Sequence, residues 1–224
     1  MTAGLTLAVD AMSGDHGAEV AVPAALDVLT STPDLRLTIV GRGDVVRPLL
    51  AGADPARCTL VEASEVVGMD ERPQDALRRK KDSSMRVAIN LVKRGEAAAC
   101  ISAGNTGALL ATARFVLGMV PGIDRPAIVS AVPAAHGHTV MLDLGANPDC
   151  TADHLVQFAV MGSVIAADLH GIDRPRVALL NIGEEDIKGT DEIREAHRRL
   201  ANAPINYQGF VEGDDIFSGD VDVV

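Results

Sequence analysis

Short apolar runs alternate with longer helix-like stretches along most of this chain of 224 residues. The runs predict strands at residues 5–9, 35–40, 59–61, 98–101, 127–132, 139–144 and 177–181. The stretches between them predict helices at residues 20–29, 85–92, 108–117, 152–169 and 192–200. This alternation is typical of parallel βαβ units with right-handed crossovers. We therefore expect an α/β fold with a mostly parallel sheet.

The composition fits such a fold, since 47% of the residues are hydrophobic while the chain has four Phe, one Tyr and no Trp. A core built mainly from aliphatic side chains suits a sheet that helices cover on both faces. The length is sufficient for one large α/β domain or two small ones, and we expect a single domain over residues 1–224. Residues 220–224 read as the start of another buried strand, so we expect that domain to be incomplete at its C-terminal end.

Charge and cysteine content narrow the class of protein. The formal net charge of −11 argues against binding to a nucleic-acid backbone, which depends on Lys and Arg. The three cysteines have neither a disulfide framework nor metal-ligand spacing, which indicates a reducing compartment. The sequence shows neither a signal peptide nor an apolar run of the length that a spanning helix needs. We expect a soluble, cytoplasmic protein without a metal or an organic cofactor.

Polar residues follow four of the predicted strands, at the edge where functional groups of a parallel sheet collect. The first such loop contains Asp10, Gly14, Asp15 and His16. Glycine allows a ligand to approach the backbone closely, and histidine can donate a proton near neutral pH. The alternative is an ordinary turn in which Asp15 caps the following helix.

The second loop, Gly104-Asn105-Thr106-Gly107, opens a predicted helix. Unpaired N–H groups and the positive end of the helix dipole at such a start favour an anion, so we expect a phosphate cradle. The loop lacks the G-x-G-x-x-G pattern of dinucleotide sites. The alternative is an ordinary helix cap by Asn105 or Thr106.

The third loop follows Asp143, a carboxylate predicted to lie within an apolar strand, where it needs hydrogen-bond partners. Asn147 and Asp149 follow it, although Asp149 could simply cap the next helix.

The fourth loop holds Glu184, Glu185, Asp186 and Lys188. Lys188 is a suitable partner for a phosphate or a developing oxyanion. Alternatively, the loop is a solvated charge run, and Thr190 with Asp191 only starts the next helix.

Together, these segments closely resemble the bacterial phosphate acyltransferase family, whose members transfer acyl groups from acyl carrier protein to phosphate. The resemblance covers nearly the whole chain, and its segments are Asp10-Ala11-Met12-Ser13-Gly14-Asp15, Arg72-Pro73, Ser83-Ser84-Met85, Ser102-Ala103-Gly104-Asn105-Thr106-Gly107-Ala108, Asp143-Leu144-Gly145-Ala146-Asn147 and Asn181-Ile182-Gly183-Glu184-Glu185. Ser13 stands where the family usually has Gly. The family normally continues for about another hundred residues.

The resemblance implies a Rossmann-like three-layer α/β/α fold, similar to those of phosphate acetyltransferase and isopropylmalate dehydrogenase. It also implies a homodimer in phospholipid synthesis that passes acyl phosphate to a membrane glycerol-phosphate acyltransferase. Such a protein would work in the cytoplasm and peripherally at the inner face of the membrane.

In that reaction phosphate attacks a thioester carbonyl, so the protein must hold an anion and stabilise an oxyanion without supplying a nucleophile. Catalytic roles are expected for Lys188, Asn105 and His16. Binding of phosphate or of the acyl substrate is expected for Asp10, Gly14, Asp15, Gly104, Thr106, Gly107, Asp143, Asn147, Asp149 and Glu184. Cys100 and Cys150 could act as covalent nucleophiles, but buried small residues are the favoured interpretation.

A basic segment between Arg72 and Arg94 contains eight basic and two acidic residues. We expect Arg78, Arg79, Lys80 and Lys81 to dock the acidic acyl carrier protein, with a merely solvated helix face as the alternative. Two other functions stay open: a non-catalytic lipid- or carrier-binding module, and an oxidoreductase similar to isopropylmalate dehydrogenase.

Overall fold

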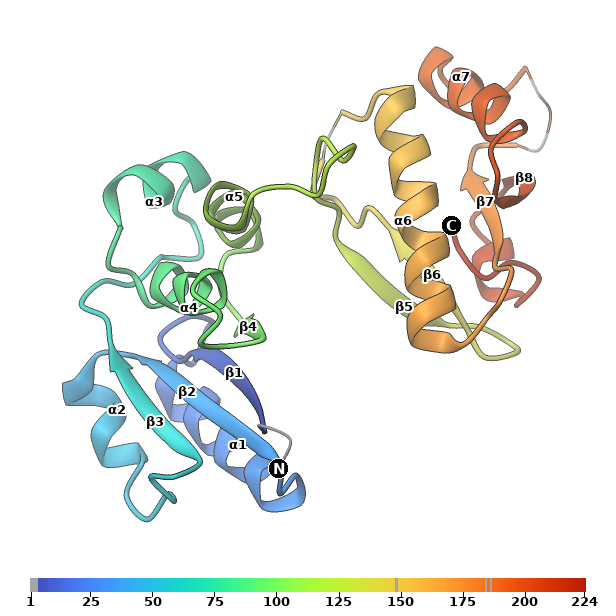
Figure 1. The fold of residues 1–224 in the computed structure, drawn as a ribbon. Helices are drawn as coiled ribbons and strands as arrows, with labels where there is room; N and C mark the ends of the chain where they lie inside the picture. The colour runs from blue at the N-terminus through green and yellow to red at the C-terminus, as the bar shows by residue number, and fades with distance from the viewer. Residues whose placement is uncertain (1–3, 148, 184, 186) are drawn as a thin grey trace. The chain divides into compact units, whose positions relative to one another are not determined.

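The computed structural model describes residues 4–147, 149–183, 185 and 187–224. The chain divides into two compact units, Met1–Gly118 (unit 1) and Met119–Val224 (unit 2), each with its own sheet and core (Figure 1). That the whole chain forms a single domain stays a prediction.

Unit 1 is built on a four-stranded parallel sheet with the order β3-β2-β1-β4. Its elements along the chain are β1 (Leu5–Asp10), α1 (Ala18–Ser31), β2 (Leu35–Gly41), α2 (Gly43–Leu49), β3 (Cys58–Glu62), α3 (Pro73–Arg79), α4 (Ser84–Lys93), β4 (Ala99–Ser102) and α5 (Thr106–Leu117).

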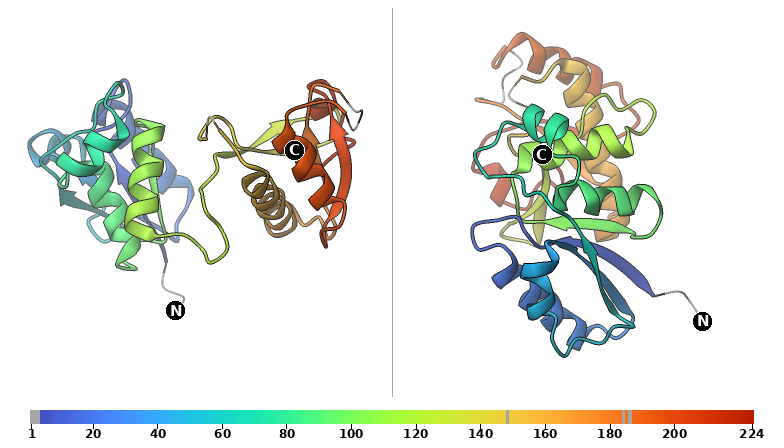
Figure 2. Two further views of the ribbon diagram at one scale, coloured as in Figure 1. Left: turned by 90° about the horizontal axis from the view of Figure 1, so that it is seen from above. Right: turned by 90° about the vertical axis from the view of Figure 1, so that its left-hand side faces the viewer.

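Helices cover both faces of this sheet, because successive strand residues point to opposite faces and both sets are apolar. Val9 of β1 packs against α1 and α2, in a cluster that includes Val22 and Val46. Ala8, the preceding residue, packs on the other face against Ala88 of α4. The two views of Figure 2 show the sheet of unit 1 between these helices. The predicted three-layer α/β/α arrangement is confirmed for this unit.

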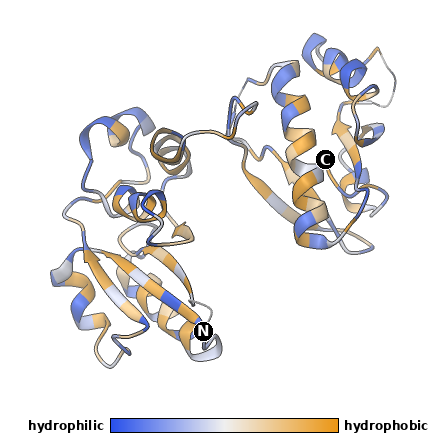
Figure 3. Ribbon diagram, in the orientation of Figure 1, coloured by the Kyte–Doolittle hydropathy of each residue, from blue (hydrophilic) through white to orange (hydrophobic). Residues whose placement is uncertain are grey.

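Unit 2 combines antiparallel and parallel pairing. Its elements are β5 (Val129–Pro133), β6 (His138–Leu142), α6 (Ala152–His170), β7 (Arg176–Leu180), α7 (Asp191–Leu200), β8 (Asn206–Val211) and a short 3₁₀ helix, Asp215–Phe217. β5 and β6 form an antiparallel hairpin, whereas β7 and β8 pair in parallel. Strands β5, β6 and β7 are mainly hydrophobic in Figure 3, whereas α7 is largely hydrophilic.

Residues 222–224 fill the space between β6 and β7 in this sheet. Val223 forms parallel bridges to both Val140 and Val177 and is 1% exposed. The N–H of Val140 donates to Asp222 O at 2.8 Å, and the N–H of Ala178 donates to Val223 O at 2.9 Å. The apolar stretch at residues 220–224 thus supplies the strand-like pairing predicted for it.

The structure corrects the prediction at several places. Helices α2 and α3 and strand β8 were not predicted, and β5 and β6 are antiparallel rather than part of a βαβ unit. Asp143 lies just beyond the end of β6 at Leu142, not within the strand. Helix α6 is long and apolar enough to cross a membrane by length and composition, a feature that the sequence interpretation missed. In unit 2 its Ala159 and Ala166 pack into the core.

Candidate functional site

The carboxyl ends of β1 and β4 form a topological switch point in unit 1. From β1 the chain builds the sheet outward through β2 and β3, and then returns to place β4 on the other side of β1. Loops that leave two such strands diverge to opposite faces, and ligands of α/β sheets bind in the resulting crevice. Asp10 and Ser102 are paired in register at this edge.

The carboxylate of Asp10 joins the two loops. The Asp10 side chain is buried, with 2% of its surface exposed, and Oδ2 accepts hydrogen bonds from Ser13 Oγ at 2.5 Å and from Ser102 Oγ at 2.7 Å. Its Oδ1 accepts a longer bond from the Met12 N–H at 3.3 Å. Ser102 Oγ in turn accepts from the N–H of Gly104 at 3.2 Å. A buried carboxylate needs such donors, so this network fixes the relative position of the loops.

Sequence reasoning missed the two serines. Ser13 was noted only as a departure from the family's usual Gly, and yet its hydroxyl supplies one of the two short bonds to Asp10. Ser102 was named only as part of the Ser102–Ala108 segment, and its contact with Asp10 follows from the pairing of β4 with β1, which the sequence does not record.

Two of the predicted site glycines are needed for packing between the loops. A Cβ on Gly104 would lie 2.6 Å from Cβ of Ser13, which no side chain could tolerate without a shift. Gly14 has a φ of 87° and faces Ala103, with only 3.2 Å between its ideal Cβ position and that of Ala103. Close approach at these glycines is therefore confirmed between the two loops, and a ligand contact at either stays a prediction.

Asn105 caps α5, which confirms the alternative interpretation of this loop. Its Oδ1 accepts from the Ala108 N–H at 3.0 Å. Its Nδ2 lies 2.8 Å from Glu71 O and 3.0 Å from Met69 O, so both amide hydrogens have backbone acceptors. The side chain thus ties α5 to the segment before α3. Its predicted catalytic role stays a prediction.

The start of α5, beside the switch point, exposes backbone N–H groups. In α5 the N–H groups of Thr106 and Gly107 have no acceptor among the residues that the structure describes, and both residues are exposed. Helix α1 begins after Gly17 without a side-chain cap, so the alternative that Asp15 caps this helix is wrong. Asp15 and His16 are both exposed beside it. Free N–H groups at a helix N-terminus favour an anion.

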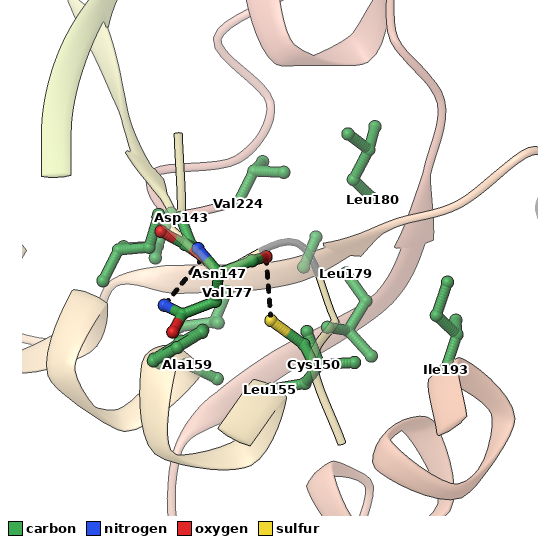
Figure 4. Close-up of a pocket in the computed structure, with 14 residues that line it drawn as sticks. Asp143, Asn147, Cys150, Leu155, Ala159, Val177, Leu179, Leu180, Ile193 and Val224 are labelled. Carbon is green, nitrogen blue, oxygen red and sulfur yellow. Dashed lines mark hydrogen bonds between the residues drawn. The ribbon is translucent and has the colours of Figure 1, made fainter. Parts of the chain in front are cut away.

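A second polar edge lies in unit 2, after β6. The carboxylate of Asp143 accepts from the N–H groups of Ala146 and Asn147 at 3.0 and 2.9 Å. It also accepts from Asn147 Nδ2 at 3.0 Å, and Figure 4 shows these two side chains beside each other. Asn147 Nδ2 also donates to Pro126 O at 2.9 Å. The expectation that Asp143 is satisfied by a hydrogen-bond network is confirmed.

Two further predicted residues of unit 2, Asp149 and Lys188, are exposed. Asp149 does not cap α6, because Thr151 and His154 form a capping box there. Lys188 is exposed on the loop after β7, and Thr190 caps α7 through the Ile193 N–H, as the alternative interpretation predicted. Glu184 and Asp186 lie outside the described residues.

The cysteines are poorly suited to nucleophilic catalysis. Burial, followed by the neighbouring Asp10 charge, raises the pKa of the Cys100 thiol to about 12. Burial and Asp143 also raise the pKa of Cys150. A thiol protonated at neutral pH is a weak nucleophile, which supports the structural interpretation of both residues.

Among the described residues, the structure shows no group of three His, Cys, Asp or Glu able to hold a metal ion.

The structure therefore groups the predicted residues by unit. Unit 1 brings Asp10, Gly14 and the loop of Gly104–Gly107 together at one sheet edge, with Asp15 and His16 on the same loop as Gly14. Unit 2 brings Asp143 and Asn147 together. A single site formed by all four loops stays a prediction.

The basic segment lies on α3, α4 and the loop between them. Arg78, Arg79 and Lys81 are exposed. Lys80 is instead used within the fold, since its Nζ donates to Glu71 Oε2 and to Val66 O, both at 2.5 Å. This bond lowers the pKa of Glu71. Carrier docking at these residues stays a prediction.

The chain is similar to proteins of known families. Residues 5–224 match the family model described as "Fatty acid synthesis protein". The chain is 59% identical over 227 residues to the phosphate acyltransferase of Alkalilimnicola ehrlichii, covering 100% of this chain and 66% of that protein. It is 58% identical over 222 residues to the phosphate acyltransferase of Methylococcus capsulatus, covering 98% of this chain and 66% of that protein. The chain thus spans 66% of the length of these relatives.

Solved structures share the fold at low identity. The EutD phosphotransacetylase from Staphylococcus aureus matches with a TM-score of 0.66 and 17% identity, over 98% of this chain and 76% of that chain. A branched-chain phosphotransacylase from Enterococcus faecalis V583 matches with a TM-score of 0.62 and 15% identity, over 98% of this chain and 78% of that chain. These likenesses confirm the predicted α/β fold class. By its sequence, the chain belongs to the fatty acid synthesis protein family, and the curated relatives that it matches are phosphate acyltransferases.

Proposed function

We propose that this protein transfers an acyl group to inorganic phosphate and so produces an acyl phosphate. The observation that carries the proposal is the pair of exposed N–H groups at the start of α5, beside the switch point of a parallel sheet. Family membership and the name of the curated relatives support the same chemistry.

In the proposed reaction a phosphate oxygen attacks the thioester carbonyl carbon. A C–O bond to phosphate forms, the C–S bond breaks, and the pantetheine sulfur leaves as a thiolate. A thiol of this type has a pKa of about 8.5, so the leaving group needs little help from an acid. The protein's task is to hold phosphate, to align it and to stabilise the tetrahedral oxyanion. The N–H groups of Thr106 and Gly107 would bind phosphate, with charge supplied by Lys188 and His16.

The finer assignments belong to the same proposal. The acyl donor would be acyl carrier protein, and the product would enter phospholipid synthesis through a membrane glycerol-phosphate acyltransferase. The protein would act as a homodimer in the cytoplasm, at the inner face of the membrane.

The direct test is formation of acyl phosphate from long-chain acyl carrier protein and phosphate. Turnover that depends on phosphate supports the proposal, and the absence of turnover together with tight carrier binding would favour a non-catalytic carrier-binding module. A rise in melting temperature with a nicotinamide nucleotide would favour the oxidoreductase.

Lys188→Ala should raise the KM for phosphate, and an unchanged KM would remove Lys188 from the site.

A proline substitution tests the α5 N–H groups themselves. Thr106 is the first helical residue, where proline is tolerated. Asn105 before it has a ψ of 109°, so it lies outside the α region that a following proline disfavours. Thr106→Pro removes one N–H donor. The KM for phosphate should rise by about 10-fold, because one hydrogen bond to a charged group is lost. Thr106→Ala keeps the N–H and is the matched control. Equal KM values for the two variants would contradict the assignment, provided that both melt at the wild-type temperature.

A further inference from the structure

A cavity of about 170 Å³, partly open to solvent, lies in unit 2 between the sheet and helices α6 and α7 (Figure 4). Its wall is mainly aliphatic and aromatic. The wall includes Leu155, Phe158 and Ala159 from α6, Val177 from β7 and Ile193 from α7. The cavity lies next to Asp143 and Asn147, at the edge where β6 ends.

The polar groups at this edge are already satisfied by their own loop. Asp143 is bonded to the N–H groups that follow it, and Asn147 Nδ2 is bonded to Asp143 and to Pro126 O. The thiol of Cys150 donates to Asn147 O at 3.7 Å. Among the described residues, no side chain that lines the cavity has a buried polar atom without a partner.

Such a cavity does not suit water or a charged ligand. A buried water needs two to four polar partners, and an apolar cavity of about 150 Å³ stays dry and binds benzene. A charged group would lose its hydration without gaining a partner. The wall therefore selects a neutral hydrocarbon, and the volume limits it to about six carbon atoms.

We propose that this cavity binds the hydrocarbon end of the acyl group, an inference that rests on the proposed acyl transfer. The polar loop at the edge of the cavity would stay outside the hydrocarbon, and the apolar wall would hold up to about six carbons of the chain. The cavity thereby becomes a specificity pocket for the length of the acyl chain.

Binding can be measured without phosphate or carrier, by titrating hexan-1-ol into the full chain with ¹³C-labelled methyl groups. Saturable shifts are expected at Leu155, Val177 and Ile193. Ala159→Leu fills the cavity and should weaken hexan-1-ol binding by about 10-fold or more. Ala167→Leu, the same change at a half-buried position outside the cavity on the same helix, should leave it unchanged. No saturable shift, or equal affinities for the two variants, would overturn the proposal.

A second variant keeps the test independent of how Ala159→Leu folds. Leu155→Ala enlarges the cavity and should shift the preference from hexan-1-ol toward octan-1-ol; an unchanged preference would count against the cavity. Hexan-1-ol should also compete with a hexanoyl donor in the acyl transfer assay. Acyl phosphate formation without such competition would overturn the cavity assignment and leave the proposed function standing. Cavity binding in a chain that forms no acyl phosphate would overturn the acyl assignment together with the proposed function.

Discussion

The side chain of Asp10 shows how one buried charge can organise a site. Its partner Ser102 is 92 residues further along the chain. The hydrogen bond from the Ser102 hydroxyl to the Asp10 carboxylate links the ends of β1 and β4. The sequence predicted a polar residue at the end of β1, because an acidic residue follows an apolar run. It could not predict the partners, because they depend on which strand lies beside β1.

Removing this charge should cost stability at the switch point. Asp10→Asn keeps the shape of the side chain but replaces one accepting oxygen with an NH₂ group, which faces the hydroxyls of Ser13 and Ser102. We expect the free energy of unfolding to fall by about 1–3 kcal/mol, the cost of a buried polar group that loses its partner. Urea denaturation measures the change. Asp15→Asn, at an exposed position on the same loop, should change it by less than about 0.5 kcal/mol. Equal effects would show that the network contributes nothing.

Elements with a clear apolar periodicity were predicted from the sequence, and those without it were not. Helix α3 buries only Ala76 and helix α2 only Val46, so neither has an apolar stripe. Strand β8 contains Gly209, with a φ of 105°, and its pairing with β7 has a register shift. Both features break the alternation that marks a strand. These elements form because their neighbours pack against them, which a local pattern does not record.

Helix caps show the same limit at the site. Asn105 and Thr190 were among the predicted caps and do cap α5 and α7. Asp15 and Asp149 were suggested as caps as well, but Gly17 and Thr151 occupy those positions. Several polar residues often lie near the start of a helix. Only the residue at the N-cap position, where the backbone enters the helix, can cap it, and the sequence does not identify this position uniquely. In contrast, the alternation of strands and helices was sufficient to predict that the candidate site residues follow the carboxyl ends of the strands.

The stability of the pairing between β7 and residues 222–224 should depend on pH, because the carboxylate of Asp222 titrates. Arg176 donates Nε to Asp222 Oδ2 at 3.0 Å and Nη2 to Oδ1 at 2.9 Å. This bonding lowers the pKa of Asp222 below its ordinary value. The unfolded chain therefore binds more protons than the folded one below pH of about 4. The stabilisation is complete above that pH and is lost as the pH falls through the folded-state pKa.

Tyr207 on β8 is the one tyrosine of the chain, which contains no tryptophan, so its fluorescence reports the unfolding of unit 2. Between about pH 5 and pH 2 the wild type should lose more stability than Asp222→Asn, because the variant no longer carries the titrating group. Asp214→Asn, at an exposed position, should follow the wild type. Parallel curves for the wild type and Asp222→Asn would contradict the role given to this pair.

At the scale of the whole molecule, charge is unevenly distributed. The chain carries 31 acidic and 20 basic residues, but residues 72–94 contain eight basic and two acidic ones. Within the fold, Lys80 is bound to Glu71, and Arg94 is bound to Glu96. Arg78 and Lys81 are exposed and have no ion-pair partner among the residues that the structure describes. These two residues are the best candidates for attracting an acidic partner.

Reversing both charges with Arg78→Glu and Lys81→Glu should weaken the binding of acyl carrier protein by about 10-fold at low salt. The difference from the wild type should shrink as salt rises, because exposed charges are screened. A control with the same change of net charge is Arg36→Glu with Arg174→Glu, at exposed positions outside the segment. If the control weakens carrier binding equally, the effect comes from total charge and the segment is not a docking surface.

The insertion of residues 222–224 between β6 and β7 also constrains how unit 2 can assemble during synthesis. Strands β5 to β8 leave the ribosome first, as two separate ladders whose inner edges have no partner. The centre of the sheet closes only when Val223 arrives, 83 residues after its neighbour Val140. Such distant pairing slows folding and leaves strand edges open to other chains. A nascent chain that lacks residues 222–224 is therefore expected to present two unpaired strand edges, which can pair with other chains.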